Sequence, residues 1–164
     1  MNHIGGVKIG PIVREACKSD ALIIAKNNIQ LALETEGMRL EERGALKGVE
    51  TVLSDSDRGF YLIVENNGQM IGQCLITREW SDWRNGYFWW VQSVYVDKDW
   101  RGKGIFSLIF DKIHSMARER IDVVGLRLYV DRENTSARGV YKRLGMNESR
   151  YVMYEMDLSG PESD

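Results

Sequence analysis

Hydrophobic and polar residues follow two periods along this chain, one of about two residues and one close to 3.6. Short runs rich in β-branched and aromatic residues predict six strands. These runs are residues 8–14, 60–65, 70–77, 87–96, 124–130 and 150–158. Apolar residues at helical spacing predict helices at residues 21–33, 45–53, 105–117 and 135–144. Asn-Gly at positions 67–68 predicts a tight hairpin between the second and third strands.

The most distinctive segment joins a predicted strand to a predicted helix. The strand that ends at Val96 is followed by a short charged turn and then by Arg101-Gly102-Lys103-Gly104, where a helix opens. Backbone N–H groups at such a helix start, together with the helix dipole, favour a bound anion, and glycine lets the anion approach closely. The nucleotide-binding pattern GxxxxGK[ST] is absent, and no third glycine completes GxGxxG. The segment therefore predicts a phosphate site of another kind.

A second motif begins about thirty residues later, at Asn134. Asn134 or Thr135 can cap a helix through its side-chain oxygen. Apolar residues then recur at positions 137, 140, 141 and 144, and Gly145 stands where a helix commonly ends. Tyr141 lies on this apolar stripe, so by itself it is compatible with a plain core position.

The first motif resembles the phosphate loop of the GCN5-related N-acetyltransferases, the GNAT family. In that family the loop reads [Arg/Gln]-x-x-Gly-x-[Gly/Ala] and follows a strand that ends in valine. Val96, Arg101 and Gly104 match this pattern, whereas Phe106 replaces the final Gly or Ala.

The second motif resembles the family's Asn-x-x-Ala-x-x-x-Tyr-x-x-x-Gly-[Phe/Met] segment. Asn134, Ala137, Tyr141, Gly145 and Met146 match it. The resemblance implies that the tyrosine lies near the coenzyme sulfur. Both motifs occur in the family's order with a strand between them, and this favours the functional interpretation of the tyrosine over the core interpretation.

The resemblance also implies a fold. We expect a mixed α/β architecture, the GNAT fold, with a central sheet of six to seven strands, splayed central strands and helices on both faces. Residues 1–164 are expected to form a single domain, in which residues 160–164 are a loose C-terminal tail.

Acetyl-CoA is the co-substrate that the resemblance implies, with its diphosphate at the glycine loop and its pantetheine arm beside the strand. The residues expected to bind it are Val94, Tyr95, Val96, Arg101, Gly102, Lys103, Gly104, Ile105, Phe106, Ser107 and Asn134. The Phe106 amide can still donate a hydrogen bond if the side chain turns towards the sheet, which its helical phase permits.

The implied reaction is direct attack of an amine on the thioester, which needs no enzyme nucleophile. Tyr141 is the expected general acid, because a tyrosine with an ordinary pKa near ~10 keeps its proton at neutral pH. The general base stays open. Gln92 stands where some diamine-acetylating relatives carry an acid, and glutamine cannot accept a proton. The remaining candidates are Glu34, Glu36, Glu79, Asp82 and a chain of waters.

Acidic and indole side chains alternate between Glu79 and Trp90. This composition suits a cationic amine through ion pairs and cation–π contacts. The residues expected to bind the amine are Glu34, Glu36, Glu79, Trp80, Asp82 and Trp83. Alternatively, Trp80 and Trp83 pack a hairpin or a homodimer contact, and one of Trp89 and Trp90 lies in the core, since neighbouring strand residues face opposite sides.

Composition excludes several classes of function. The 164 residues carry a formal net charge of −2, which gives no general attraction to nucleic acid or to an anionic membrane. Apolar runs are too short for a membrane span, and the N-terminus lacks a signal-peptide pattern, so a cytoplasmic location is expected. Cys17 and Cys74 are expected to be reduced core thiols. His3 and His114 are isolated, so no metal is expected.

These observations favour an acetyl-CoA-dependent N-acetyltransferase acting on a small primary amine. Acetylation of a peptide or protein is the second hypothesis, although the tryptophan-rich segment argues against an open groove. The third is a non-catalytic sensor that binds acyl-CoA without turnover, against which the presence of Tyr141 argues.

Overall fold

A computed structural model describes residues 10–158, which form two compact units that divide between Tyr129 and Val130. The first unit contains a sheet and three helices, and the second contains one helix followed by an irregular segment. The strands are β1 (Ile12–Glu15), β2 (Phe60–Asn66), β3 (Gln69–Ser81), β4 (Gly86–Val96) and β5 (Val123–Arg127). The helices are α1 (Ala21–Glu36), α2 (Glu42–Ser54), α3 (Ile105–Arg118) and α4 (Thr135–Arg143).

The sheet is mixed and has the strand order β1-β2-β3-β4-β5. Each of the first four strands runs antiparallel to its neighbour, and β5 runs parallel to β4. The return to β4 in the parallel direction requires a crossover, which α3 supplies. The β2–β3 turn has positive φ at both Asn67 and Gly68, 50° and 79°, as the Asn-Gly pair predicts.

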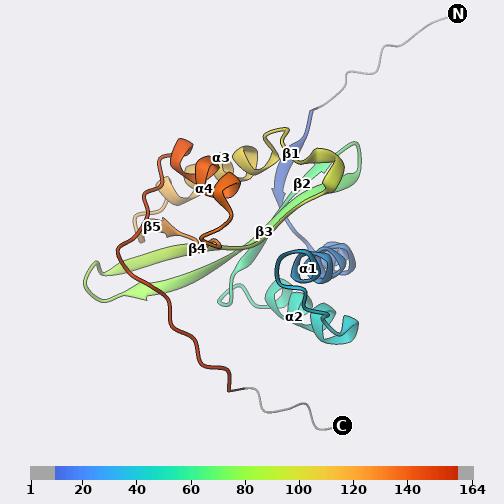
Figure 1. The fold of residues 1–164 in the computed structure, drawn as a ribbon, viewed down its shortest axis with the longest axis horizontal. Helices are drawn as coiled ribbons and strands as arrows, with labels where there is room; N and C mark the ends of the chain where they lie inside the picture. The colour runs from blue at the N-terminus through green and yellow to red at the C-terminus, as the bar shows by residue number, and fades with distance from the viewer. Residues whose placement is uncertain (1–9, 159–164) are drawn as a thin grey trace, which may run out of the picture. The chain divides into compact units, whose positions relative to one another are not determined.

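Helices cover both faces of this sheet (Figure 1). In β2, Leu62 and Val64 point into a core that contains the buried face of α3, whereas Tyr61 and Ile63 point into a second core under α1 and α2. Because side chains alternate between the two faces along the strand, β2 contributes to both cores. Both cores exclude water almost completely, since Leu62 and Ile63 are each 0% exposed.

A buried polar group joins α1 to the sheet. Gln73 in β3 is fully buried, and its amide oxygen accepts a hydrogen bond from Asn27 Nδ2 at 2.9 Å. Its amide nitrogen donates to Asn28 Oδ1 at 2.9 Å. Buried polar groups without partners are costly, so these bonds fix the position of α1 on this face.

Five of the predicted strands are confirmed, with shifts of a few residues at their ends. The first, expected over residues 8–14, is observed at Ile12–Glu15, and residues 8–9 lie outside the described part of the chain. The strand predicted at residues 150–158 is wrong, because this segment is irregular and its Tyr154 is 91% exposed. The described sheet therefore has five strands instead of the expected six to seven. The predicted tail at residues 160–164 lies outside the described residues.

All four predicted helices are observed. Asp20 precedes α1, and α2 begins three residues before its predicted start because Glu41 accepts hydrogen bonds from the Arg43 and Gly44 amides. Asn134 caps α4 by accepting from the Ala137 amide at 3.0 Å.

The expectation of two core thiols is half right. Cys74 is buried and Cys17 is exposed, and both are free thiols. Cys17 follows β1 and lies beside the short turn at residues 18–20, at the edge of the core rather than within it.

Candidate coenzyme and acceptor site

The candidate site begins where β4 and β5 separate. Their pairing runs only from Tyr87 to Trp90, which faces Arg127. After Trp90, β4 continues to Val96 along β3, and no strand among the described residues pairs with its other edge. The pairing ends because β5 itself ends at Arg127. Backbone groups along an unpaired edge can accept an extended ligand as an added strand.

A bulge in β4 lies within the unpaired stretch. Gln73 pairs with Tyr95 and Leu75 pairs with Gln92, so Cys74 opposes two residues of β4. Ser93 has a φ of 48°, which is uncommon for a residue other than glycine. No local pattern predicts this bulge, since Ser93 is an unremarkable strand residue.

Strand alternation identifies the backbone groups that face the open edge. The Asp97 amide donates to the Ile71 carbonyl on the β3 side at 3.0 Å. Val96 and Val94 therefore direct their backbone groups to the opposite edge. The Val96 carbonyl accepts a hydrogen bond from Arg101 Nε at 2.9 Å, which ties the glycine loop back to the strand.

The loop itself is built from two left-handed glycines. Gly102 and Gly104 have φ values of 73° and 80°, and a Cβ at either position would meet no other atom within 4 Å. Glycine is needed here for backbone conformation rather than for space. Gly104 is the N-cap of α3 and supplies no side-chain cap, so amides of the first turn, including those of Ile105 and Ser107, have no acceptor within the helix. The loop can therefore donate to an anion.

Phe106 does not turn into the loop. Its side chain packs against the α3 core, with its ring centroid 6.2 Å from that of Phe110. The departure from the family pattern at this position is thus accommodated by packing, as the helical phase predicts. On the same helix, Leu108 is 39% exposed.

The cations of the loop already have partners. Arg101 Nη2 donates to Glu34 at 2.7 Å, and Lys98 Nζ lies 3.3 Å from the same carboxylate. Hydrogen bonds from Gln30 and Arg101, followed by that from Lys98, lower the pKa of Glu34 to about 2. Lys103 Nζ lies 5.3 Å from the centre of the Trp100 ring. Glu34, expected at the amine, therefore contacts the phosphate loop.

The second motif lies in the second unit. Tyr141 is half-buried on α4, and burial raises the pKa of its hydroxyl above the ordinary value of 10.0. Asn134, expected at the coenzyme, uses its side-chain oxygen to cap α4. Gly145 follows the helix with a φ of 86°, the conformation that a glycine at a helix end commonly adopts.

A second cluster lies on the face of the sheet opposite α3. Glu79 accepts a hydrogen bond from Arg127 at 2.8 Å and another from the Trp90 indole. The Arg127 guanidinium lies 3.6 Å from the centre of the Phe88 ring, a cation–π contact. Gly125 makes room for that ring, because a Cβ there would lie 2.7 Å from it. Trp89 points into the α3 core, so the two neighbouring tryptophans face opposite sides as predicted.

The other residues expected at the amine are dispersed. Trp80 packs edge-on against Tyr87 at 4.9 Å, and strand alternation puts it on the opposite face from Glu79. Asp82 and Trp83 form the exposed turn after β3, where Trp83 is 90% exposed. Glu36 is exposed at the end of α1. The structure brings Glu79 together with Trp90 and Arg127, and Glu34 together with Lys98 and Arg101.

Sequence reasoning missed the partners in both clusters. Neither Lys98 nor Arg127 is among the predicted site residues. Arg127 lies two positions after Gly125 in β5, so strand alternation alone puts it on the face of the sheet that carries Phe88. Gln92 donates from Nε2 to Thr77 Oγ1 at 2.8 Å, a contact that no local pattern indicates.

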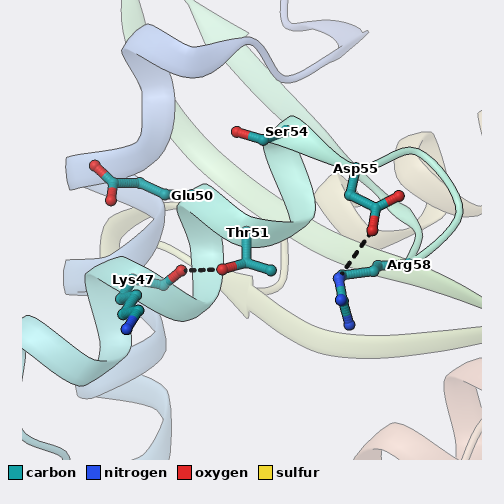
Figure 2. A pocket seen from close by; sticks show the side chains of 6 residues that line it. All are labelled: Lys47, Glu50, Thr51, Ser54, Asp55 and Arg58. Carbon is teal, nitrogen blue, oxygen red and sulfur yellow. Dashed lines mark hydrogen bonds and ion pairs between the residues drawn. The ribbon is translucent and has the colours of Figure 1, made fainter.

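A surface hollow on α2 is separate from these clusters. Figure 2 shows that its lining side chains come from the helix and the turn that follows it, and that Arg58 pairs with Asp55. The two charged groups are 3.0 Å apart. Its lining residues are Lys47, Glu50, Thr51, Ser54, Asp55 and Arg58. None of them belongs to the predicted site. Its charged groups are exposed, so it is an ordinary surface depression.

Residues 10–158 contain neither a metal-binding cluster nor a helix that could span a membrane. No three histidine, cysteine, aspartate or glutamate side chains of this part of the chain are arranged to hold a metal ion. None of its helices is long and apolar enough to cross a membrane.

The glycine loop after β4 and the helix that carries Asn134 and Tyr141 both lie within a segment that matches a known family. The profile of the Acetyltransferase (GNAT) family matches residues 29–146. The chain belongs to this family, and its mixed sheet with five described strands and four helices is a GNAT-like fold.

Individual proteins resemble this chain to different degrees. A crystal structure of a possible acetyltransferase from Clostridium difficile 630 has 43% sequence identity and a TM-score of 0.85, covering 93% of this chain and 100% of that one. An uncharacterized N-acetyltransferase from Methanocaldococcus jannaschii is 30% identical over 101 residues, 61% of this chain, and the match spans 44% of that protein's length. A predicted acetyltransferase with acetyl-CoA from Clostridium acetobutylicum shares the fold, with 21% identity, a TM-score of 0.72 and coverage of 90% and 96%.

Proposed function

We propose that this protein is an acetyl-CoA-dependent N-acetyltransferase that acts on a primary amine of a small molecule. The observation that carries the proposal is the unpaired edge of β4 beyond Trp90, which leads into the glycine loop at the start of α3. An extended chain can add to such an edge, and a diphosphate suits such a helix start. Coenzyme A combines an extended pantetheine arm with a diphosphate in one molecule.

The coenzyme-binding residues have distinct proposed roles. Amides from Gly102 to Ser107 would donate to the diphosphate, and Arg101 and Lys103 would add charge. Val94 would offer its backbone to the pantetheine arm, because strand alternation turns it to the open edge. The Val96 carbonyl is taken by Arg101, so its proposed part is to hold the loop.

The proposed reaction is a direct acyl transfer. Bound acetyl-CoA supplies an acyl group activated as a thioester. The amine nitrogen bonds to the carbonyl carbon, the carbon–sulfur bond breaks, the nitrogen loses a proton, and the thiolate takes one. Tyr141 would donate that second proton, and its raised pKa supports this role because the hydroxyl stays protonated at neutral pH.

The acceptor is proposed to lie over the Glu79–Arg127–Trp90 cluster. Arg127 compensates the charge of Glu79, so this carboxylate would orient an amine by hydrogen bonding rather than by net attraction. A carboxylate has about four acceptor positions, and two of them are used here. The neighbouring Trp90 ring, which is partly exposed, supports a small acceptor with an apolar part.

Calorimetry and a thiol-release assay together test the proposal. We expect acetyl-CoA and CoA to bind, and thiol release to appear in a screen of polyamines, amino acids, aminoglycosides and peptides. Release with a small amine would support the proposal, and release with peptides alone would favour a peptide or protein acetyltransferase. Binding without release for every amine would favour a sensor. No binding of either coenzyme form would overturn all three hypotheses.

A further inference from the structure

One carboxylate from the first helix reaches the phosphate loop. Glu34 lies in the last turn of α1, and its two oxygens contact Lys98 at 3.3 Å and Arg101 at 2.7 Å. The proposed diphosphate would need Arg101, one of these two cations, and would lie close to the other. An anion of the protein thus stands at a site that the proposed function assigns to an anion of the ligand.

The position of Glu34 is fixed from its own side. Gln30, one turn earlier on α1, donates to Glu34 Oε1 at 2.7 Å. The helix is held on the sheet by two hydrogen bonds of Gln73, which accepts from Asn27 and donates to Asn28. The carboxylate is therefore presented by a rigid element, and not by a loose loop.

Arg101 does not depend on Glu34 for its orientation. Its Nε donates to the Val96 carbonyl at 2.9 Å, and its guanidinium lies 5.8 Å from the centre of the Tyr95 ring. Arginine has five donors in a fixed fork, so one bond to the backbone already restricts the plane of the group. Removing the Glu34 charge would leave an oriented and uncompensated cation.

Glu34 neutralises the net charge of the loop. From Asp97 to Gly104 the chain carries three cations and two acids, which leaves one net positive charge. Glu34 cancels that charge through its two ion pairs. A diphosphate that enters while Glu34 stays in place meets a like charge, and a diphosphate that displaces Glu34 must break two ion pairs.

We propose that Glu34 is a built-in competitor of the coenzyme diphosphate, which occupies Lys98 and Arg101 until the coenzyme displaces it. This inference rests on the proposed function. The competing carboxylate lowers the affinity of the loop for the coenzyme. Binding then includes an exchange, in which the diphosphate replaces the Glu34 carboxylate. An acid in the last turn of a helix is disfavoured by the helix dipole, so the ion pairs with the loop are also what stabilises it there.

The test is the affinity of Glu34→Gln for CoA, measured by calorimetry at 50 mM NaCl. Glutamine keeps the shape and an oxygen acceptor for Gln30, so only the charge is removed. Exposed ion pairs are each worth up to about 1 kcal/mol, so the variant should bind CoA roughly three- to tenfold more tightly than the wild type. The gain should shrink at 0.5 M NaCl, because salt screens exposed charges. Pantetheine, which lacks the diphosphate, should bind both proteins equally.

Glu50→Gln is the matched control. It makes the same change of net charge at an exposed side chain of α2, outside the predicted site, and should alter the CoA affinity less than twofold. Equal or weaker CoA binding by Glu34→Gln would overturn the inference, since it would mean that Glu34 organises the loop for the coenzyme. If the wild type itself binds no CoA, the proposed function fails. The two failures are thus distinguishable.

Discussion

At the scale of single residues, the Tyr141 hydroxyl carries the proposed proton transfer. Burial raises its pKa, and phenylalanine would keep the ring while removing the donor. Tyr141→Phe should lower kcat by about 10²-fold, as is typical for loss of a general acid, and leave the Kd for CoA within about twofold. Thiol release and calorimetry measure the two effects. Tyr154→Phe, at a side chain 91% exposed, is the control and should change neither. Unchanged turnover in Tyr141→Phe would refute the assignment.

Residues whose roles are local could be predicted from the sequence. Asn134 caps a helix by accepting a hydrogen bond from the amide of Ala137, three residues later. Phe106 packs against the core because of its position on its own helix. Glu34 and Arg101 are different, because they are 67 residues apart and meet only after α1 has docked on the sheet. Their contact depends on tertiary packing, which no spacing along the chain encodes.

At the scale of an element, the start of α3 depends on the left-handed backbone of Gly104. An alanine there costs about 1–2 kcal/mol of stability, because an L-residue is strained at this φ. Gly48 lies inside α2, where alanine should instead stabilise by about 0.5–1 kcal/mol. A Cβ at either glycine meets nothing within 4 Å, so the pair isolates backbone conformation. Urea unfolding should therefore give opposite signs for Gly104→Ala and Gly48→Ala. Changes of the same sign would contradict this explanation.

The elements themselves were predictable to different extents. Helices and hairpins are specified by neighbours in the chain, and they appear where the pattern predicts them. Residues 150–158 have strand-like alternation, but a strand exists only where another strand pairs with its backbone, and the described structure offers this segment no ladder. The bulge at Ser93 likewise depends on register with β3 rather than on its own sequence.

At the scale of the molecule, two motifs sufficed to predict the family. Each motif is a continuous segment, so its residue types and their spacing are visible directly in the sequence. The Glu79–Arg127–Trp90 cluster, proposed to hold the acceptor, could not be predicted in the same way. Glu79, Trp90 and Arg127 come from three strands, and only the pairing of β3, β4 and β5 makes them neighbours. Sequence therefore indicates the reaction more directly than the substrate.

The stability of the first unit against acid follows from one ion cluster that joins three elements. Arg14 of β1 contacts Asp20 before α1 at 2.8 Å and Glu65 of β2 at 3.0 Å. The hydrogen bond from Arg14 lowers the pKa of Asp20 from 3.8 to about 2.

A lowered pKa means that the folded state binds this proton more weakly than the unfolded state. The stabilisation is therefore complete above about pH 4 and disappears as the pH falls towards 2. One pKa unit corresponds to about 1.4 kcal/mol, so the contribution at pH 7 is on the order of 2 kcal/mol.

Asp20→Asn should remove this contribution at neutral pH and flatten the acid dependence. The free energy of unfolding in urea, followed by circular dichroism at pH 7, 4 and 2.5, should show the variant about 2 kcal/mol less stable at pH 7 and close to the wild type at pH 2.5. Convergence is expected because the wild-type carboxyl has then lost much of its advantage as well. Asp111→Asn, at an exposed position on α3, should leave the wild-type curve unchanged. A constant offset between Asp20→Asn and the wild type at all three pH values would mean that Asp20 stabilises the fold by shape and hydrogen bonding, and that its charge contributes little.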